Sequence, residues 1–520
     1  MPLSGSVEAE RLLEKAARPR PHWAAWFAGL TLLMLACCAW SLPLSLRFQR
    51  YLLFDHGANL WVQHLLDQGL RPGVDFGYQY GVLPLLVGRA WSWCFGLNPW
   101  SYQALATVLN IGLVLALVRG LEAVRAPFEA RVLTVCGVPF TVPVTAFSLN
   151  HGVEAVLLAH AFSEHLRGRH DRALALCTAA VFAKPALAYP YGLLVLIRLA
   201  AQAAQGSSRT GVASFERSLR PAIVTGLGLA GVLAAWFGPV SLLRTIVPVS
   251  AVRIYDQYRC GFFTGLGRNF WRPPAATVHY YLTNVAGYWL VASVLLLVAG
   301  LVATWRIVQR QRVRRTWRTT DECVVVAAAL HLTFVSTMFA GDWSWSYYAY
   351  LLLMGLVAAW RLGRFFRSSL LALAILAALG CQTQFAAGLL AWSHTRATAS
   401  TAGLWETNEY RAEWERVRSS TRDHHSMILV FAGAAPLWFS EFEGLPTFHL
   451  ARGVVLPLEL QRDIARIEAA ERVVIPSYGL QAFFAPASWP EFEQLSHRRE
   501  TLWSGRFFRV LGPTRPLTSE

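Results

Sequence analysis

Carboxylates and imidazoles gather in one polar stretch near the start of the chain. Residues 50–86 read RYLLFDHGANLWVQHLLDQGLRPGVDFGYQYGVLPLL and carry Asp55, His56, His64, Asp67 and Asp75 among aromatic residues and glycines. Carboxylates beside a membrane surface can accept protons or bind cations. The same stretch also fits a solvated loop, in which Asp55 caps a helix and RPGVDFG forms a turn.

Lys184 stands inside the apolar block ALALCTAAVFAKPALAYPYGLLVLI. An ammonium in the middle of a membrane helix costs about 2.5 to 3.5 kcal/mol on insertion scales, so such a charge usually lines a cavity or meets a partner. Pro185 interrupts the helix at this point. The lysine could therefore meet a lipid phosphate at the break, or it could snorkel or pair with an acidic residue.

Two further groups of residues have types suited to sugar phosphates. The stretch LNHGVEAV contains Asn150, His151 and Glu154, which either face the same surface as Asp55 or cap and pair within the helix bundle. Arginines and aromatic rings, the combination that grips phosphate and stacks on sugars, occur together further along. They are Arg259 and Arg268 in RIYDQYRCGFFTGLGRNFWRPP, and Tyr348 in GDWSWSYY. A belt of Trp and Tyr at the membrane interface explains the aromatic residues equally well.

The composition requires a membrane around these residues. Hydrophobic residues make up 55% of the 520 positions, charged residues make up 15%, and the mean hydropathy is +0.37. A soluble domain has about 25% charged residues, and the apolar blocks here are about 17 to 25 residues long, enough to cross a bilayer. The net charge of +16 does not indicate nucleic acid, because the arginines lie in short clusters between apolar blocks. The eight cysteines form no disulfide framework or CxxC site.

The positive-inside rule orients the spans. Residues 1–21 carry Arg11, Lys15, Arg18 and Arg20 and are predicted to be cytoplasmic. A first span at 22–46 then leads to an external loop at 47–99, whose last part, 81–97, is an interfacial or re-entrant helix, or else a full span. Further spans follow at about 100–118, 132–148 and 152–166.

The second half of the membrane module, which as a whole covers residues 22–392, follows the same rule. The block at 173–198 is predicted to enter and return as two half-helices, interrupted at Lys184-Pro185 and at Pro190. A span at 221–243, a long external loop and a span ending near Thr304 come next, and three more blocks end near Trp392. The basic cluster RIVQRQRVRRTWRTT is a cytoplasmic anchor.

Residues 393–520 differ from the membrane module in composition and pattern. Two polar or amphipathic helices, WETNEYRAEWERVRSS and LELQRDIARIEAA, alternate with the strand-like runs MILVFAG and RVVIP. This tail is predicted to be a small extracytoplasmic α/β domain. The predicted fold class is therefore mainly α, a polytopic transmembrane helical bundle with this domain at its C-terminus.

Four short motifs resemble the GT-C superfamily of membrane glycosyltransferases, including the protein mannosyltransferase and aminoarabinose transferase relatives. They are Asp55-His56-Gly57, GLRPGVDF, QYGVLPLL and Lys184-Pro185. The resemblance implies a GT-C-like bundle, a second polar cluster at His151 and Glu154, and a sugar donor carried on polyprenyl phosphate. It also implies roles for single residues: Asp55 as the general base, Asp75 and Tyr80 as neighbours that shape the site, and Lys184 as a contact of the lipid phosphate. The loop arginines Arg259 and Arg268 are expected to stabilise the same phosphate.

His56 departs from this pattern, because the superfamily often has Glu after the catalytic Asp. His56 could ligate a divalent metal ion, but no spacing specifies one, so no cofactor is assigned.

The function expected from these observations is an inverting glycosyltransferase in a bacterial inner membrane. It would move a sugar from a polyprenyl-phosphate donor to a glycan, lipid or protein acceptor outside the cytoplasm, in contact with membrane lipids and without nucleic acid. No nucleotide-binding GxxxxGK[ST] loop is present. A flippase or transporter of lipid-linked sugars, or a membrane scaffold without catalysis, remains an alternative.

Overall fold

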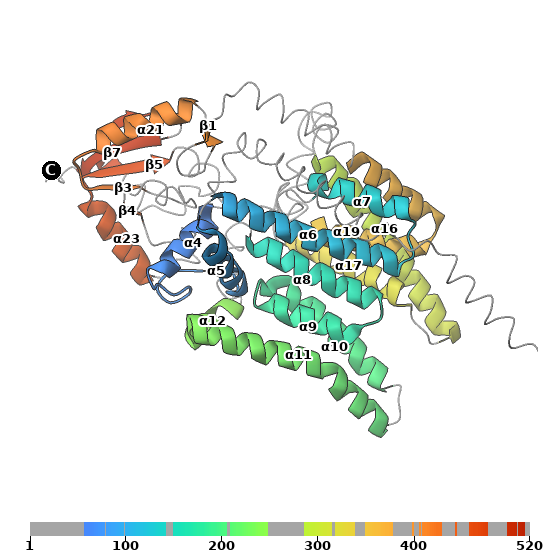
Figure 1. Cartoon of the computed structure of the whole chain (residues 1–520). Helices are drawn as coiled ribbons and strands as arrows, with labels where there is room; N and C mark the ends of the chain where they lie inside the picture. The colour runs from blue at the N-terminus through green and yellow to red at the C-terminus, as the bar shows by residue number, and fades with distance from the viewer. Residues whose placement is uncertain are drawn as a thin grey trace, which may run out of the picture.

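A computed structural model describes residues 57–78, 80–97, 99–141, 149–204, 208–247, 285–314, 318–337, 349–377, 398–399, 405–406, 408–428, 443–444, 457–476, 497–506 and 508–514. Most of them form a body of packed helices, and a small sheet near the C-terminus lies beyond one end of that body (Figure 1).

The helical body is built mainly from apolar helices. Its elements are α4 (Gly57–Asp67), α5 (Leu83–Phe95), α6 (Pro99–Ala123), α7 (Phe128–Thr141), α8 (Leu149–Leu166), α9 (His170–Val181), α10 (Pro185–Ala204), α11 (Ser208–Phe237), α12 (Pro239–Ile246), α16 (Val285–Arg314), α17 (Thr319–Thr337), α19 (Ala349–Ala359) and the 3-10 turn η2 (Trp360–Leu362). Residues 364–377 are also helical.

Four of the described helices have segments long and apolar enough to cross a bilayer: Ala104–Ala123, Pro185–Ala204, Val212–Phe237 and Tyr288–Gln311. Together with the small sheet, they confirm the predicted fold class of a mainly helical membrane protein with an α/β unit at its C-terminus. α5 has 13 residues, a length of about 20 Å, which is too short for a crossing. This favours the interfacial or re-entrant interpretation of residues 81–97.

Small residues let the helices pack closely, as is usual in membranes. A Cβ atom on Gly355 would lie 2.6 Å from Leu296 and 2.7 Å from Ala327, and one on Gly300 would lie 2.7 Å from Ala328. These contacts join α19, α16 and α17. α8 lies at the centre of the body, with contacts to α6, α9, α17 and α19 and nearly all of its residues buried.

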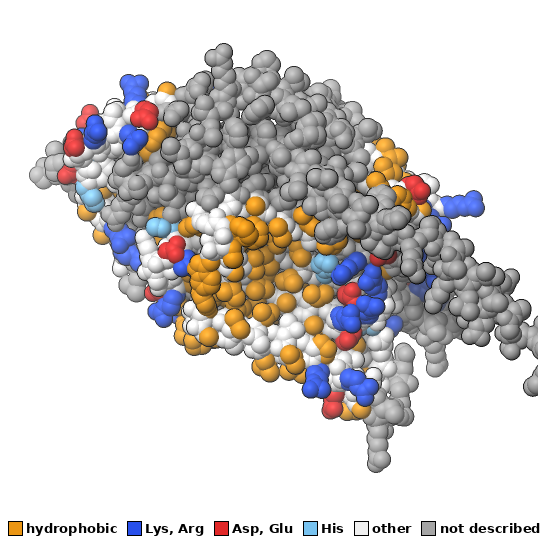
Figure 2. Space-filling view, viewed as in Figure 1, with side chains coloured by type: hydrophobic (Ala, Val, Ile, Leu, Met, Phe, Trp, Pro, Cys, Tyr) orange, Lys and Arg blue, Asp and Glu red, His pale blue; other side chains and the backbone are white. Residues whose placement is uncertain are grey.

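The outside of the body is apolar between two polar ends. Leu193 on α10, Leu227 on α11 and Leu301 on α16 are among the exposed large hydrophobic residues. Figure 2 shows a broad band of hydrophobic side chains on one face, with charged side chains gathered toward both ends of the band. This distribution is expected for a surface that contacts lipid tails.

Arginine-containing ion pairs define one end of the body, which we call the basic end. Arg167 at the end of α8 pairs with Glu122 of α6 at 3.3 Å. Arg198 near the end of α10 pairs with Glu322 at the start of α17 at 3.2 Å, and Arg310 near the end of α16 pairs with Asp321. The other end, which carries the connection 68–82 between α4 and α5, is the loop end.

Two details of the predicted spans are wrong. α10 continues through Pro190 for 20 residues, about 30 Å, and is not a half-helix. Proline inside a membrane helix is tolerated where neighbouring groups satisfy the backbone carbonyl that loses its hydrogen bond. The helix predicted to begin at Pro221 begins at Ser208 instead, because the basic stretch before it is also helical.

The C-terminal unit contains a five-stranded mixed sheet. Its strands are β3 (Ser426–Ile428), β4 (Glu443–Gly444), β5 (Arg472–Pro476), β6 (Arg499–Ser504) and β7 (Phe508–Thr514), in the order β4-β3-β5-β7-β6. β3 is parallel to β4 and β5, whereas β7 is antiparallel to β5 and β6. The helices α21 (Asn408–Thr421) and α23 (Pro457–Ala469) accompany the sheet, and a separate two-residue pair joins β1 (Thr398–Ala399) and β2 (Trp405–Glu406).

Candidate functional site

The break between α9 and α10 places Lys184 at the loop end. α9 ends at Val181, and the backbone N–H of Lys184 still donates to the carbonyl of Ala180 at 2.8 Å. Pro185 has no N–H and starts the next helix, a position that suits proline. The Lys184 side chain is therefore fixed at the junction of two helices, where it is 3% exposed.

The first turns of α8 supply the polar partners of this lysine. The Nζ atom of Lys184 lies 3.1 Å from Nδ1 of His151 and 3.9 Å from a carboxylate oxygen of Glu154. His151 Nδ1 lies 3.6 Å from the same carboxylate oxygen. Residues three apart share one face of a helix, so α8 presents both side chains to Lys184 together. We call these three residues the Lys184 cluster.

The connection between α4 and α5 packs directly against the Lys184 cluster. The backbone N–H of Gly81 donates to the carbonyl of Ala183 at 3.0 Å, and that of Leu83 donates to Phe182 at 2.9 Å. The Tyr80 ring centroid lies 5.8 Å from Lys184 Nζ and 6.1 Å from the ring centroid of His151. The loop thus lays an aromatic ring against the ammonium.

A buried tyrosine also ties the same loop to α8. The Tyr78 hydroxyl donates to Oδ1 of Asn150 at 2.9 Å. Burial raises the pKa of Tyr78 well above its usual value, so it remains a neutral donor at physiological pH. On α4, burial lowers the pKa of His64, although the nearby Asp67 opposes this shift.

The Asp75 side chain stabilises the turn to which it belongs. Its carboxylate accepts hydrogen bonds from the backbone N–H and from Nε of Arg71, at 2.8 and 3.1 Å. Gly73 in this turn has a φ of +72°, a conformation that glycine adopts readily. Arg244 of α12 donates to the Gly73 carbonyl at 2.9 Å and holds the turn in place. The structure therefore brings Tyr80, His151, Glu154 and Lys184 together and leaves Asp75 in an ion pair with Arg71.

The other predicted site residues lie outside the described part of the chain: Asp55, His56, Arg259, Arg268 and Tyr348. The described residues closest in sequence to Asp55 approach the Lys184 cluster, because Leu60 of α4 shares a hydrophobic cluster with Ala183 and Val153.

Among the described residues, no group of three or more His, Cys, Asp and Glu side chains is arranged to hold a metal ion. Within the Lys184 cluster, His151 and Glu154 have suitable donor atoms, but the ammonium of Lys184 within 4 Å of both would repel a cation. A divalent ion at His56 stays a prediction.

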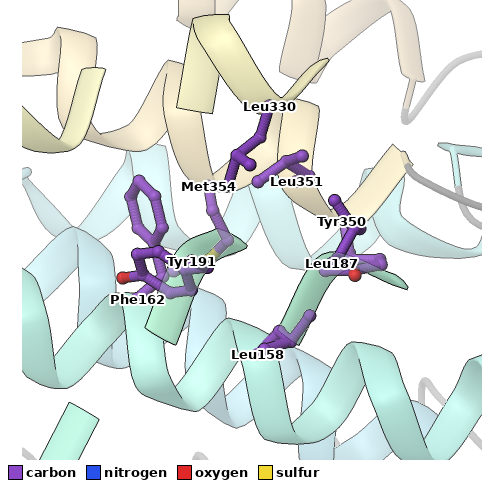
Figure 3. Close-up of a pocket in the computed structure, with 8 residues that line it drawn as sticks. All are labelled: Leu158, Phe162, Leu187, Tyr191, Leu330, Tyr350, Leu351 and Met354. Carbon is purple, nitrogen blue, oxygen red and sulfur yellow. The ribbon is translucent and has the colours of Figure 1, made fainter. Parts of the chain in front are cut away.

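A small apolar cavity lies among α8, α10, α17 and α19 (Figure 3). It is lined by Leu158, Phe162, Leu187, Tyr191, Leu330, Tyr350, Leu351 and Met354 and has room for about one water molecule. Tyr191, one of its lining residues, also takes part in a second polar group: its hydroxyl lies 3.1 Å from His165, which in turn lies 3.6 Å from Glu322.

Sequence reasoning missed three parts of this arrangement: the close approach of Gly81 to Phe182, the Tyr78–Asn150 hydrogen bond and the His165–Glu322 group. Each joins segments that are far apart in sequence. The polar residues inside apolar blocks, such as His165 and Arg198, were the available signal for the last of these.

Comparison with known proteins gave a similarity at the level of structure. No family model and no curated protein matches the chain. The fold is similar to the crystal structure of ArnT from Cupriavidus metallidurans bound to undecaprenyl phosphate, with 12% sequence identity and a TM-score of 0.48. The similarity covers 95% of this chain and 98% of that one.

Proposed function

We propose that the protein is an inverting glycosyltransferase that moves a sugar from a polyprenyl-phosphate donor to an acceptor on the extracytoplasmic side of a bacterial inner membrane. The acceptor is a glycan, a lipid or a protein. The observation that carries this proposal is the buried ammonium of Lys184, held between the first turns of α8 and the Tyr80–Gly81 loop at the end of a membrane-type helix bundle.

The position of this ammonium favours a lipid-borne anion. Lys184 directly precedes the long apolar helix α10, whose flank is among the exposed apolar surfaces of the protein. A ligand that combines a phosphate with a long hydrocarbon can place its charge at Lys184 while its tail remains in the bilayer. Because the cluster is closed in this structure, the loop around Tyr80 has to shift when the phosphate enters.

The chemistry follows from charge development. When the bond between the sugar and the phosphate breaks, negative charge grows on the phosphate, and a nearby cation stabilises it most at that moment. Asp55 takes the proton of the acceptor hydroxyl, and a single displacement inverts the anomeric carbon. Arg259 and Arg268 add positive charge, Tyr80 and Tyr348 shape the sugar site, and His56 stands beside the base.

Binding of undecaprenyl phosphate tests the proposal without knowledge of the sugar. We expect Lys184→Met to weaken the affinity of the purified protein in nanodiscs by about tenfold to a hundredfold, since hydrogen bonds to charged groups contribute about 1.5 to 3 kcal/mol. Lys184→Arg should retain most of the affinity. Arg71→Met is the matched control, because Arg71 pairs with Asp75 on the surface of the same loop. Equal affinity in wild-type protein and Lys184→Met would refute the phosphate seat.

Transfer itself is then measured with labelled polyprenyl-phosphate sugars. Asp55→Asn should abolish transfer of the accepted sugar and leave undecaprenyl phosphate binding unchanged. Movement of the labelled lipid across vesicles without transfer by the wild-type protein would show a flippase instead.

A further inference from the structure

Glu154 is a buried carboxylate that accepts no hydrogen bond from the part of the chain that the structure describes. Its side chain is 0% exposed, and neither oxygen has a hydrogen-bond partner among the described residues. The nearest positive or potentially positive groups are His151 Nδ1 at 3.6 Å and Lys184 Nζ at 3.9 Å. Buried polar atoms without a partner are rare and call for a functional or structural reason.

The three groups of the Lys184 cluster combine a positive charge, a negative charge and an imidazole. An ammonium has three N–H donors and no acceptor, so the ring nitrogen of His151 that faces Lys184 at 3.1 Å carries no proton. Lys184 and Glu154 then cancel each other's charge, with a neutral imidazole beside them. The arrangement has a basic nitrogen on His151 and an unsatisfied carboxylate next to it.

A phosphate at Lys184 disturbs this balance. A phosphate oxygen accepts the Lys184 hydrogen bond in place of His151, and the phosphate brings negative charge close to Glu154. Uncompensated charge is strongly unfavourable in a buried site. A proton on the His151–Glu154 pair removes part of that excess, and a phosphate oxygen bound to Lys184 lies no more than about 6 Å from His151.

We infer that the His151–Glu154 pair holds the proton that the departing lipid phosphate takes up, so that His151 acts as the general acid of the transfer; this inference rests on the function proposed above. The bond between the anomeric carbon and the phosphate oxygen breaks, and its electron pair stays on that oxygen. The phosphate then takes the proton from His151. The acceptor oxygen forms the new bond to carbon and gives its own proton to Asp55. Water restores the proton of the pair after the products leave.

Other titratable groups lie on the elements packed around the pair. Tyr350 from α19 interacts electrostatically with Glu154 and with Cys177 of α9. On α17, Asp321 pairs with Arg310, Glu322 with Arg198 and His165, and His331 with Ser293. Lys184 contacts both members of the pair, and the Tyr80 ring lies against His151. Farther out, Tyr78 bonds to Asn150 and interacts with Tyr102 of α6, and Arg89 of α5 pairs with Asp67.

Proton uptake on binding tests the inference directly. Calorimetry of undecaprenyl phosphate binding to the full chain, at about pH 8 in two buffers of different ionisation enthalpy, counts the protons taken up. At this pH the free phosphate is mostly a dianion, since its second pKa is about 6. We expect uptake approaching one proton per bound lipid in the wild-type protein. His151→Asn should lose most of this uptake while affinity changes less than tenfold.

His331→Asn is the matched control, because His331 is also a buried histidine but bonds to Ser293 at 2.8 Å, away from Lys184. It should keep the wild-type uptake. Binding of the lipid by wild-type protein without proton uptake would overturn the inference, and this measurement needs no variant. Uptake that persists in His151→Asn would also overturn it, whereas a complete lack of binding by the wild-type protein would overturn the proposed function instead.

Discussion

Gly81 controls how closely the loop approaches the Lys184 cluster. A Cβ atom at this position would overlap the carbonyl group of Phe182 and lie 3.0 Å from the backbone nitrogen of Ala183. These are backbone atoms at the end of α9, so they cannot move aside as a flexible side chain would. We expect Gly81→Ala to push the loop away and to cost the two hydrogen bonds to Phe182 and Ala183. Overpacking of this kind costs about 1 to 3 kcal/mol. We therefore expect the affinity for undecaprenyl phosphate to fall about tenfold or more.

Gly228→Ala provides the control for this change. Gly228 lies inside α11, and a methyl group added there would meet no atom within 4 Å. Alanine stabilises a helix interior relative to glycine by about 1 kcal/mol. The affinity of this variant for the lipid phosphate should therefore equal that of the wild type. If Gly81→Ala also bound the lipid normally, the loop would not position the phosphate seat.

Single-residue chemistry was partly predictable from the sequence. The cost of burying charge pointed to Lys184, and the polar start of an apolar block pointed to His151 and Glu154. That the three lie within 4 Å of one another emerges only from packing. The role of Gly81 could not be predicted, because a glycine requirement that comes from a distant carbonyl leaves no local pattern.

Arg499 joins a helix and a strand in the C-terminal unit. Its buried guanidinium donates to the carbonyls of Ile467, Glu468 and Ala470 at the end of α23, at 2.5, 3.2 and 3.0 Å, and to Gly512 of β7 at 2.7 Å. The last carbonyls of a helix have no partner within the helix, so this side chain caps α23. Lysine has one charged nitrogen and cannot reproduce the planar fork of arginine.

We expect Arg499→Lys to destabilise the C-terminal unit by about 2 to 4 kcal/mol, because several buried carbonyls lose a charged donor. Hydrogen exchange of the β5–β7 amides in the full chain measures this change. Arg498→Lys is the control: Arg498 is a neighbouring arginine whose ion pair with Glu468 lies at the surface, so its replacement should cost under about 1 kcal/mol. Equal exchange in both variants would rule out the capping role.

The elements show where sequence patterns succeed and fail. Apolar blocks predicted most helices of the body, and the runs RVVIP and LELQRDIARIEAA predicted β5 and α23. The hairpin of β6 and β7 was not predicted, although Gly505 marks its turn, because its exposed strand has no clear alternation. Pro190 was predicted to interrupt the helix, but α10 continues through it because its tertiary environment accommodates the proline.

The whole molecule has two chemically different ends. Arginines pair with acidic residues where α6, α8, α10 and α16 end, whereas the Lys184 cluster and the loop of residues 68–82 lie at the opposite end of α8. The C-terminal sheet also lies toward the loop end in Figure 1. On the positive-inside rule, we propose that the basic end faces the cytoplasm and the Lys184 cluster faces the outside. An extracytoplasmic acceptor requires this orientation.

Thiol labelling from one side of the membrane tests that orientation. Cys94 on α5 is exposed near the loop end, so a membrane-impermeant maleimide should label it in intact cells of a variant whose other seven cysteines are replaced by serine. In a background without Cys94, the exposed Thr501 of β6, as Thr501→Cys, should label equally from outside. Arg169→Cys at the basic end should label only after permeabilisation. Because all three sites belong to one folded chain, the reverse pattern would place the Lys184 cluster in the cytoplasm, where a lipid-linked donor is not required.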